Sequence, residues 1–416
     1  MSIRIPPGLS SVALKIIVGS TLIGVITVSK VVILSAKRTP IGKAGRSLRN
    51  VSAVKLGTTA VKGAIRTVHL NPKLVDQVIL GNVLQAGSGQ NVARQVELNA
   101  GIPVTSTANT VNQVCGSGMK AVRDGEAAIL MHDAKVVVVG GTESMSNAPF
   151  LNFNVRNSRH KLGNVTLVDD LNRDALLDAF SHQPMGVTAE NVARKYHVSR
   201  LTQDKFTLRS NRLAALAQNQ HTFDSEIVPV RLANHRWFTK DECIHRDTNL
   251  TKLAQLKPVF KRHGTVTAGN SSGLNDGASA LILTSDVTAR HLGIRPLATI
   301  AGYAEAGIDP SLMGYAPYYA VKKLFQKEHL NMNQIDLVEF NEAFAAQTVA
   351  VARDLKIPLN KLNVTGGAIA LGHPLGDSGS RIVVTLIHNL RRLHKHRGLA
   401  MLCIGGGMGM AMYIKC

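Results

Sequence analysis

Cysteine, aromatic residues and acidic residues are all scarce in this sequence, and each shortage narrows the class of protein. The 416 residues include four cysteines, at no regular spacing and with no Cys-x-x-Cys pair, which argues against a disulfide scaffold and a zinc site and favours a reducing compartment. Aromatic residues make up only 4% of the chain, whereas 36 residues are glycine. That balance suits an α/β protein with tight turns and close packing of helices on sheets. The chain is long enough for two to three domains.

The shortage of acidic residues leaves a formal net charge of +21, which predicts an anionic partner. Nucleic acid is one candidate. The basic residues are scattered, however, and no basic stripe interleaved with aromatic residues is present. A substrate that carries phosphate groups explains the charge as economically. We therefore expect a small anionic substrate and no nucleic-acid partner, with a nucleic-acid binder kept as a minor alternative.

The first 30 residues contain no acidic residue, and the first one in the chain is Asp76. This charge sign and the serine content are typical of a mitochondrial presequence. The β-branched run from Ile16 to Val28, however, would form only a weak amphipathic helix. It is also shorter than the ~20 apolar residues of a membrane span, and Lys15 interrupts its extension. We expect residues 1–30 to be an N-terminal extension that serves in targeting, without stable membrane insertion, and the mitochondrial matrix is slightly favoured over the cytoplasm.

Short apolar runs alternate with helical stretches along the rest of the chain, which is the pattern of α/β layers. The predicted strands are Val31–Ser35, Gln77–Ile79, Lys135–Val139, Leu281–Thr284, Asp336–Phe340 and Leu399–Cys403. An internal echo is also present, because SGMKAV leads through a helix to VVVVGG and SGSRIVV leads through a helix to MLCIGG. A duplicated α/β unit is the simplest interpretation. Residues 148–267 are more polar and too long for a loop, so we expect a subdomain that carries binding contacts.

Two cysteines and one histidine carry the expected chemistry. Cys115 in NQVCGSGMKAV and Cys403 in LCIGGGMGM each lie where an apolar run meets glycines, and His373 in GGAIALGHPLGDSG lies between them. A helix N-terminus favours the thiolate of a nearby cysteine, and an imidazole can take the thiol proton, so Cys115 is a candidate nucleophile. A second thiol could act as acid or base. Taken singly, each residue is more often a packed cysteine or a capping histidine.

The longer strings around these residues change that balance. They are VVILSAKRTPIGK, GNVLQAGSGQNVARQ, NQVCGSGMKAV, GGTESMS, MGVTAENVA, GTVTAGNSSGLNDGA, VEFNEAFAAQ, GGAIALGHPLGDSG and CIGGGMGMAM. They follow one another over almost all of residues 31–416 and resemble the thiolase family. The CIGGGMGMAM ending is most similar to the acetyl-CoA C-acetyltransferases (acetoacetyl-CoA thiolases) of the animal cytosolic type.

The resemblance implies an α/β thiolase fold, in which two similar βαβαβαββ halves stack as a five-layer αβαβα sandwich with an inserted loop domain. On this basis we expect an N-terminal thiolase domain at 31–147 and 268–295. A CoA-binding loop domain would occupy 148–267, and a C-terminal thiolase domain 296–416. The resemblance also implies acyl-CoA and CoA as partners and a homotetramer built as a dimer of dimers.

The implied reaction is the reversible Claisen condensation of two acetyl-CoA to acetoacetyl-CoA plus CoA. By match to the family motifs, Cys115 becomes acetylated, His373 deprotonates it and donates to a thioester oxygen, and Cys403 moves the α-proton. Asn341 matches the residue that holds a water for one oxyanion hole, and the N–H groups of Cys115 and Gly405 match the second hole. No metal or redox cofactor is required.

Further matches concern the binding of CoA. Ser272 holds the family position that contacts pantetheine, and Ala268 lies in the same loop. Met185, Met313 and Phe344 match residues that wall the acyl and pantetheine pocket. A separate match is Arg246, which is expected to reach the adenine or phosphate end of CoA, although the family's Arg-His pair reads here as His245-Arg246.

The chain departs from the family pattern near the acyl pocket. Pro184 replaces the usual His before Met-Gly, with His182 two positions earlier, which puts substrate choice in question. Asp377 replaces the usual Ala, and a carboxylate buried near His373 would raise the imidazole pKa. A third departure is a group of tyrosines expected to reshape the pocket mouth: Tyr315, Tyr318 and Tyr319. Two alternative functions stay open, a 3-ketoacyl-CoA thiolase of longer chains in fatty acid β-oxidation and a thiolase-like acyl-CoA or lipid-binding protein with little turnover.

Overall fold

The computed structural model describes residues 13–18, 21–27, 30–153, 155–156 and 162–416. Each predicted strand lies inside an observed strand or begins one residue before it. Near the N-terminus, β1 (Ala13–Val18) pairs antiparallel with β2 (Thr21–Thr27). A strand pair suits the β-branched residues there better than a helix. None of the helices within the described ranges has the length and apolar character needed to cross a membrane.

The N-terminal half has the predicted βαβαβαββ order. Its elements are β3 (Val31–Arg38), α1 (Ala53–Thr67), β5 (Gln77–Gly81), α2 (Val92–Asn99), β6 (Thr107–Val111), α3 (Ser117–Leu130), β7 (Val136–Ser144) and β12 (Asn275–Ser285). The strands lie in the order β3-β12-β7-β5-β6, and the short β4 (Gly42–Lys43) also pairs with β12. β5 runs parallel to its two neighbours, whereas β12 runs antiparallel to β3 and β7.

The C-terminal half repeats this order, except that the strand after α9 (Ala345–Asp354) is shortened to a single bridge. Its elements are β13 (Ala298–Gly307), α8 (Ala316–Glu328), β14 (Leu337–Phe340), α9 (Ala345–Asp354), α10 (Ala368–Leu371), α11 (Leu375–Arg392), β15 (Arg397–Ile404) and β16 (Met408–Lys415). The strands lie in the order β14-β15-β16-β13, and β13 also pairs with β3, which joins the halves. A short helix, α7 (Asp286–His291), connects β12 to β13.

The strand that would follow α9 is a single parallel bridge between Val338 and Leu362. Asn363 ends it, because its backbone is in the left-handed region at φ 43°. Its side chain replaces ladder hydrogen bonds, since Oδ1 accepts from the N–H of Phe340 at 2.7 Å and Nδ2 donates to the carbonyl of Phe340 at 2.8 Å.

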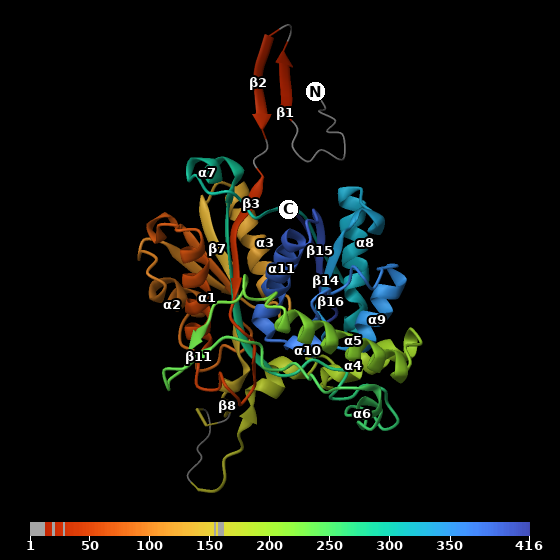
Figure 1. Ribbon diagram of the computed structural model, residues 1–416. Coiled ribbons are helices and arrows are strands. Elements are labelled where there is room, and N and C mark those ends of the chain that lie inside the picture. Colours follow the sequence, from red (N-terminus) through yellow and green to blue (C-terminus); the bar gives the residue numbers. More distant parts are fainter. Residues whose placement is uncertain (1–12, 19–20, 28–29, 154, 157–161) are drawn as a thin grey trace.

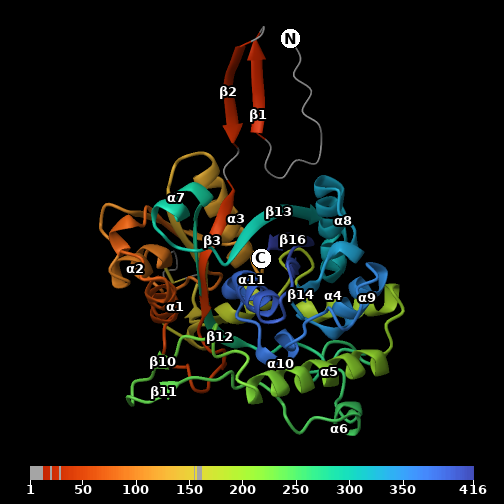
Figure 2. The same ribbon diagram turned by 45° about the horizontal axis from the view of Figure 1, so that its top comes forward.

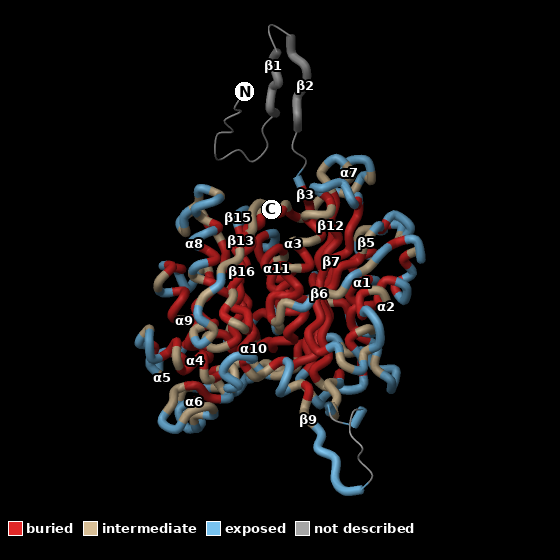
Figure 3. Tube along the Cα trace, turned by 180° about the vertical axis from the view of Figure 1, so that it is seen from behind, coloured by how far each residue is buried: buried red, intermediate tan, exposed pale blue. Residues whose placement is uncertain are grey.

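The five predicted layers are present (Figure 1). α3 and α11 lie between the two sheets, α1 and α2 cover the outer face of the N-terminal sheet, and α8 and α9 cover the outer face of the C-terminal sheet. Burial is concentrated in the sheets and the central helices (Figure 3). α11 is buried nearly all round, with polar residues such as Arg381 and Thr385 buried beside Ile382, Val384 and Ile387. Each of these apolar side chains contributes roughly 1.5–3 kcal/mol.

Residues 148–267 form the connection between β7 and β12. This segment contains β8 (Phe150–Leu151), β9 (Val168–Asp169), α4 (Met185–Lys195), α5 (Arg200–Asn219), β10 (Val230–Arg231), β11 (Trp237–Phe238) and α6 (Leu250–Ala254). Figures 1 and 2 show α4, α5 and α6 lying together with α10 across one end of the sandwich. The helices of the insertion therefore cover the end at which the functional residues gather.

Candidate active site

Cys115 lies in a tight turn between β6 and α3, two residues before the helix begins. The preceding Val114 has φ 47°, a conformation that costs a β-branched residue on the order of 1–3 kcal/mol. The hydroxyl of Ser117 supports this turn, because it accepts from the N–H of Gln113 at 2.8 Å and donates to the carbonyl of Val114 at 2.6 Å. The strained turn fixes the position of the thiol.

The thiol of Cys115 is 9% exposed. Burial raises its pKa to about 11, although hydrogen bonds from the backbone N–H groups of Gly405 and of Cys115 itself act in the opposite direction. The backbone donors therefore favour the thiolate, but the thiol stays neutral in the resting protein. Desolvation of the charged form outweighs the nearby donors.

His373 lies between α10 and α11 and is buried. Its Nδ1 is 2.6 Å from the hydroxyl of Ser378, which donates to the carbonyl of Pro374 at 2.7 Å. Because that hydroxyl proton is already used, Nδ1 carries the proton and donates, and Nε2 is left as the base. Burial, followed by the charge of Arg381, lowers the imidazole pKa to about 3. His373 is thus neutral and able to accept a proton.

Cys403 lies near the end of β15 and is fully buried. Its S–H donates to Oε1 of Gln347 at 3.1 Å, and Nε2 of Gln347 donates to the carbonyl of Asn341 at 3.2 Å. The second bond fixes the orientation of the amide. Burial, and then the neighbouring Cys115, raise the pKa of Cys403 above its ordinary value. The second thiol is therefore protonated at rest.

Asn341 lies beside the imidazole of His373. Its Nδ2 is 3.4 Å from Nε2 and 3.5 Å from Nδ1 of that ring. Asn341 is fully buried and does not line the cavity described next, and its Oδ1 has no hydrogen-bond partner within the described part of the chain. Its predicted role in holding a water stays a prediction.

A cavity of about 410 Å³ collects most of the predicted site residues. Those that line it are Cys115, Met185, Ser272, Met313, Phe344, His373, Cys403 and Gly405. We refer to it as the catalytic cavity. Its walls are largely apolar, and the rings of Phe260 and Phe344 meet edge to face, with their centroids 6.2 Å apart.

Ala268 and Arg246 do not reach the catalytic cavity. They line a second cavity of about 680 Å³, together with Lys43, His245 and Lys252. We refer to it as the basic cavity. The guanidinium of Arg246 donates to side-chain oxygens of Gln218 and Asn219 at the end of α5. The segment between Ala268 and Gly273 connects the two cavities.

Comparison with known proteins places this geometry in a family. The model of the thiolase N-terminal domain matches residues 31–287, and that of the thiolase C-terminal domain matches residues 294–416. The chain belongs to the thiolase family. This thiolase is therefore an acyltransferase enzyme.

Relatives and solved structures resemble this thiolase over nearly its whole length. An acetyl-CoA acetyltransferase of Chromobacterium violaceum is 48% identical, over 93% of this chain and 99% of its own. A probable acetyl-CoA acyltransferase of Staphylococcus aureus is 46% identical over the same shares. The crystal structure of the Bacillus anthracis acetyl-CoA acetyltransferase matches with a TM-score of 0.91 at 41% identity, over 93% of this chain and 99% of that one. Human mitochondrial 3-ketoacyl-CoA thiolase matches with a TM-score of 0.90 at 42% identity, over the same shares.

Asp377 does not act on His373 as the sequence suggested. The carboxylate is buried in the first turn of α11, where its Oδ1 accepts from the hydroxyl of Ser279 on β12 at 2.5 Å. Burial raises the Asp377 pKa to about 7, so the group is partly neutral. The charge that acts on the imidazole is that of Arg381, and it lowers the His373 pKa. The predicted increase is wrong because Asp377 faces the sheet.

The tyrosines also lie away from the catalytic cavity. The ring of Tyr315 stacks on Tyr196 of α4 with centroids 3.8 Å apart, and its hydroxyl donates to Asp354 of α9 at 2.7 Å. Tyr318 and Tyr319 pack against the same ring, and none of the three lines the catalytic cavity. The expectation that they reshape the pocket mouth is therefore wrong. Tyr315 is buried against its stacked neighbours, which is more favourable than exposing its ring at the mouth, whereas Tyr319 is 45% exposed.

The change at Pro184 does reach the catalytic cavity. Pro184 lines its wall, whereas His182 is exposed and does not. The wall therefore presents an apolar ring where the family resemblance implies an imidazole.

Several positioning residues of the thiolase were missed by sequence reasoning. Ser378 and Gln347 orient His373 and Cys403. The available signal was that Ser378 lies in the string around His373 and Gln347 in the string around Asn341. Glu143 is fully buried and accepts from the N–H of Gly376 at 2.8 Å, which ties β7 to the start of α11. Asn275 accepts from the N–H of His373 at 2.9 Å. These last two contacts join segments far apart in the chain, so no local sequence pattern predicts them.

Proposed function

We propose that this thiolase is an acetyl-CoA C-acetyltransferase that interconverts two acetyl-CoA with acetoacetyl-CoA and CoA. The observation that carries the proposal is the sharing of one cavity by Cys115, His373 and Cys403. Each has a different polar partner, so each can have a different role. An acyl acceptor, its base and a separate proton donor are the groups that the reaction needs.

In the thiolysis direction, the Cys115 proton moves to Nε2 of His373. The sulfur then bonds to the keto carbon of acetoacetyl-CoA, and the bond between that carbon and the α-carbon breaks. The electron pair stays on the α-carbon, which takes the proton of Cys403, and acetyl-CoA leaves. The imidazolium proton returns to the Cys403 thiolate. Finally His373 takes the proton of free CoA, whose sulfur accepts the acetyl group, and the regenerated Cys115 thiolate takes that proton back.

The first proton transfer, from Cys115 to His373, must create two charges from two neutral groups. His373, with a pKa of about 3, and Cys115, with a pKa of about 11, are both neutral before substrate binds. No ion pair is formed in advance. The N–H groups of Cys115 and Gly405 reach the sulfur, and donors of this kind stabilise developing charge by about 3 kcal/mol each.

We propose that CoA spans both cavities. The human 3-ketoacyl-CoA thiolase with a similar fold was solved in complex with CoA. In this chain Ser272 would contact pantetheine in the catalytic cavity, and the cations of Lys43, Arg246 and Lys252 would attract the phosphates at the nucleotide end.

A 3-ketoacyl-CoA thiolase of longer chains is the second candidate. The observation that favours it is the apolar wall at Pro184, where a long acyl chain loses no polar contact. Thiolysis rates on acetoacetyl-CoA and 3-ketooctanoyl-CoA, measured side by side, separate the two candidates. A higher kcat/KM on acetoacetyl-CoA supports the first, and the reverse order supports the second.

The same assay on Cys115→Ala tests the nucleophile. We expect thiolysis to fall at least about a thousandfold, because no acyl-enzyme can form. Mass spectrometry after exposure to acetyl-CoA should show an acetyl group on Cys115 in the parent only. An inactive parent without this adduct would favour the acyl-CoA or lipid-binding protein.

Assembly and compartment are further proposals. The family resemblance supports a homotetramer, which sedimentation equilibrium would test by mass. The acid-free residues 1–30 support a mitochondrial address, with residence in the cytoplasm as the alternative. A fluorescent fusion with and without those residues would distinguish the two.

A further inference from the structure

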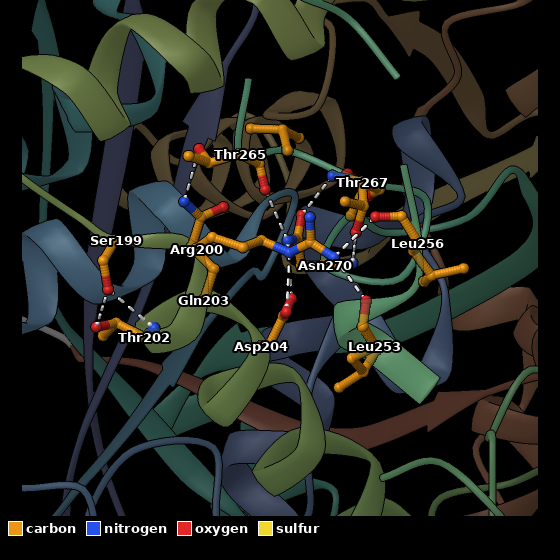
Figure 4. Close-up of polar contacts among 12 residues, drawn as sticks. Ser199, Arg200, Thr202, Gln203, Asp204, Leu253, Leu256, Thr265, Thr267 and Asn270 are labelled. Carbon is orange, nitrogen blue, oxygen red and sulfur yellow. Dashed lines mark hydrogen bonds and ion pairs between the residues drawn. The ribbon is translucent and has the colours of Figure 1, made fainter. Parts of the chain in front are cut away.

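A network of hydrogen bonds from the start of α5 holds the segment that connects the two cavities (Figure 4). Ala268 and Gly269 line the basic cavity, and Ser272 and Gly273 line the catalytic cavity. Asn270 lies between the two pairs and is fully buried. Whatever holds Asn270 therefore sets how one cavity is placed relative to the other.

The side chain of Asn270 makes three hydrogen bonds. Its Nδ2 donates to Oδ1 of Asp204 at 3.2 Å and to the carbonyl of Thr265 at 3.1 Å, and its Oδ1 accepts from the N–H of Thr267 at 2.8 Å. Gln203, the neighbour of Asp204 on α5, donates to the hydroxyl of Thr265 at 2.9 Å. The start of α5 thus holds the chain at two residues, Thr265 just before the segment and Asn270 within it (Figure 4).

Arg200 extends the network to α6. Its Nε donates to Oδ2 of Asp204 at 2.8 Å, and a terminal nitrogen donates to the carbonyls of Leu253 and Leu256 at 2.6 and 2.9 Å. These carbonyls lie at the C-terminal end of α6, where a cation is favourable. The one carboxylate of Asp204 therefore links Asn270 to the end of α6. Figure 4 shows Arg200 between Asp204 and these two carbonyls.

The two ends of the segment are anchored differently. At the catalytic cavity, the N–H of Ser272 donates to the carbonyl of Ala343 at 2.9 Å, and the N–H of Ala345 donates to the carbonyl of Asn270 at 2.9 Å. These bonds do not involve α5. At the basic cavity, Gly269 packs against Leu253 of α6 and against Leu256 just after that helix, so closely that a Cβ there would lie 2.9 Å and 2.5 Å from them. That end depends on where Arg200 holds α6.

We propose that Arg200, Asp204 and Asn270 form a clamp, the α5 clamp, that positions the basic cavity for the nucleotide end of CoA. The inference rests on the proposed binding of CoA. The three are positioning residues, because their side chains face the segment and α6 and line neither cavity. Thr207, one turn after Asp204, does line the basic cavity, so the same helix builds the clamp and part of the binding surface.

Asp204→Asn is the sharpest test, because the side chain keeps its size and loses its charge. Arg200 and Asn270 donate to different oxygens of Asp204, so the NH2 group of an asparagine must face one of these two donors. We expect the KM for acetoacetyl-CoA in thiolysis to rise about tenfold, which corresponds to about 1.4 kcal/mol of binding free energy. The kcat should change less than about twofold. For acetoacetyl-pantetheine, which lacks the nucleotide, kcat/KM should stay within about twofold of the parent.

Calorimetry of CoA and pantetheine binding gives a readout that needs no turnover, and the Kd for CoA alone should rise. Asp286→Asn is the matched control. It removes an i, i+4 ion pair with Arg290 on α7, and neither residue lines either cavity. Arg200→Lys should fall between the parent and Asp204→Asn, because lysine keeps the charge but has no fork to span Asp204 and the α6 carbonyls.

Equal losses on both substrates, or no change on either, would overturn the clamp. If Asp204→Asn does not fold, Arg200→Lys takes its place, since lysine keeps the charge but lacks the fork that spans Asp204 and the carbonyls of Leu253 and Leu256. The same selective loss on acetoacetyl-CoA is expected, and an unselective loss overturns the proposal. A parent that turns over neither substrate and binds no CoA would instead contradict the proposed function.

Discussion

The two halves of this thiolase repeat one order of elements but use the loop before the central helix for different chemistry. Cys115 stands two residues before α3, and His373 stands two residues before α11. The loop that precedes the central helix thus supplies the thiol in one half and the base in the other, although the two residues are not at equivalent positions of the sequence echo. Since α3 and α11 pack side by side in the central layer, the duplicated scaffold brings the two positions together.

The glycine pairs of the two halves diverge in the same way. In β7, Gly140 and Gly141 continue the strand, and a Cβ on Gly141 would lie 2.0 Å from the carbonyl of Gly376 at the start of α11. After β15, the corresponding pair is Gly405 and Gly406. Gly406 and the following Gly407 have φ of 82° and 83° and reverse the chain into β16. One pair allows close packing, and the other places Gly405 beside Cys115. The two halves share one order of elements, whereas local packing determines the role of corresponding residues in each half.

The largest expected effect comes from removing Cys403, which tests whether the two thiols have separate roles. Cys403→Ala should slow thiolysis and condensation by about 10²–10⁴-fold, because no group remains to move the α-proton. Acetylation of Cys115 by acetyl-CoA should continue, since that half-reaction uses only Cys115 and His373. Mass spectrometry of the acetyl adduct checks this, and loss of the adduct would show that the thiols do not have separate roles.

A smaller effect is expected at the base. In Ser378→Ala, Nδ1 of His373 loses its partner, and leaving a buried group unpaired costs about 1–3 kcal/mol. We expect kcat to fall about tenfold. The pH profile of kcat should also change shape, which a purely structural role would not cause.

Ser380→Ala is the control for that variant. It removes another buried hydroxyl of α11, one that donates to the carbonyl of Asp377. Equal losses in both variants would mean that α11 is merely destabilised.

Alkylation compares the two thiols directly. With a Cys115 pKa of about 11, the rate of its modification by iodoacetamide should rise about tenfold per pH unit through neutral and mildly alkaline pH, because only the thiolate reacts. Cys403, which is fully buried with a raised pKa, should react far more slowly. Peptide mass spectrometry separates the sites. A plateau in the Cys115 rate below about pH 9 would show that the thiolate is stabilised after all.

The smallest effect concerns stability at the start of α11. The Asp377 pKa of about 7 in the folded protein is above the unfolded value of about 3.9. The native state therefore binds the extra proton, and the stability contributed at low pH is lost as the pH rises through about 7. Asp377→Asn cannot ionise and can still accept from Ser279. Its melting temperature relative to the parent should rise by at least about 2 °C at pH 8, with a smaller difference at pH 5 in differential scanning calorimetry.

The sequence predicted most of what depends on local pattern. Apolar runs such as Val31–Ser35 and Leu399–Cys403 are strands because their residues suit a buried sheet, and the echo of SGMKAV in SGSRIVV is the pair α3 and α11. Motif strings singled out Cys115 and His373, and both line the catalytic cavity. Strand propensity and short motifs act over a few residues, so they can be read along the chain.

The tertiary structure decided what depends on surroundings. Burial, which no local pattern measures, made both Cys115 and His373 neutral despite the helix N-terminus that follows the thiol. The directions in which Asp377 and Tyr315 point came from packing against β12 and α4. The clamp from Arg200 to Asn270 joins segments 70 residues apart in sequence. Sequence determined which groups the protein has, whereas desolvation and contact between distant segments decided the charge that each carries and the site that each serves.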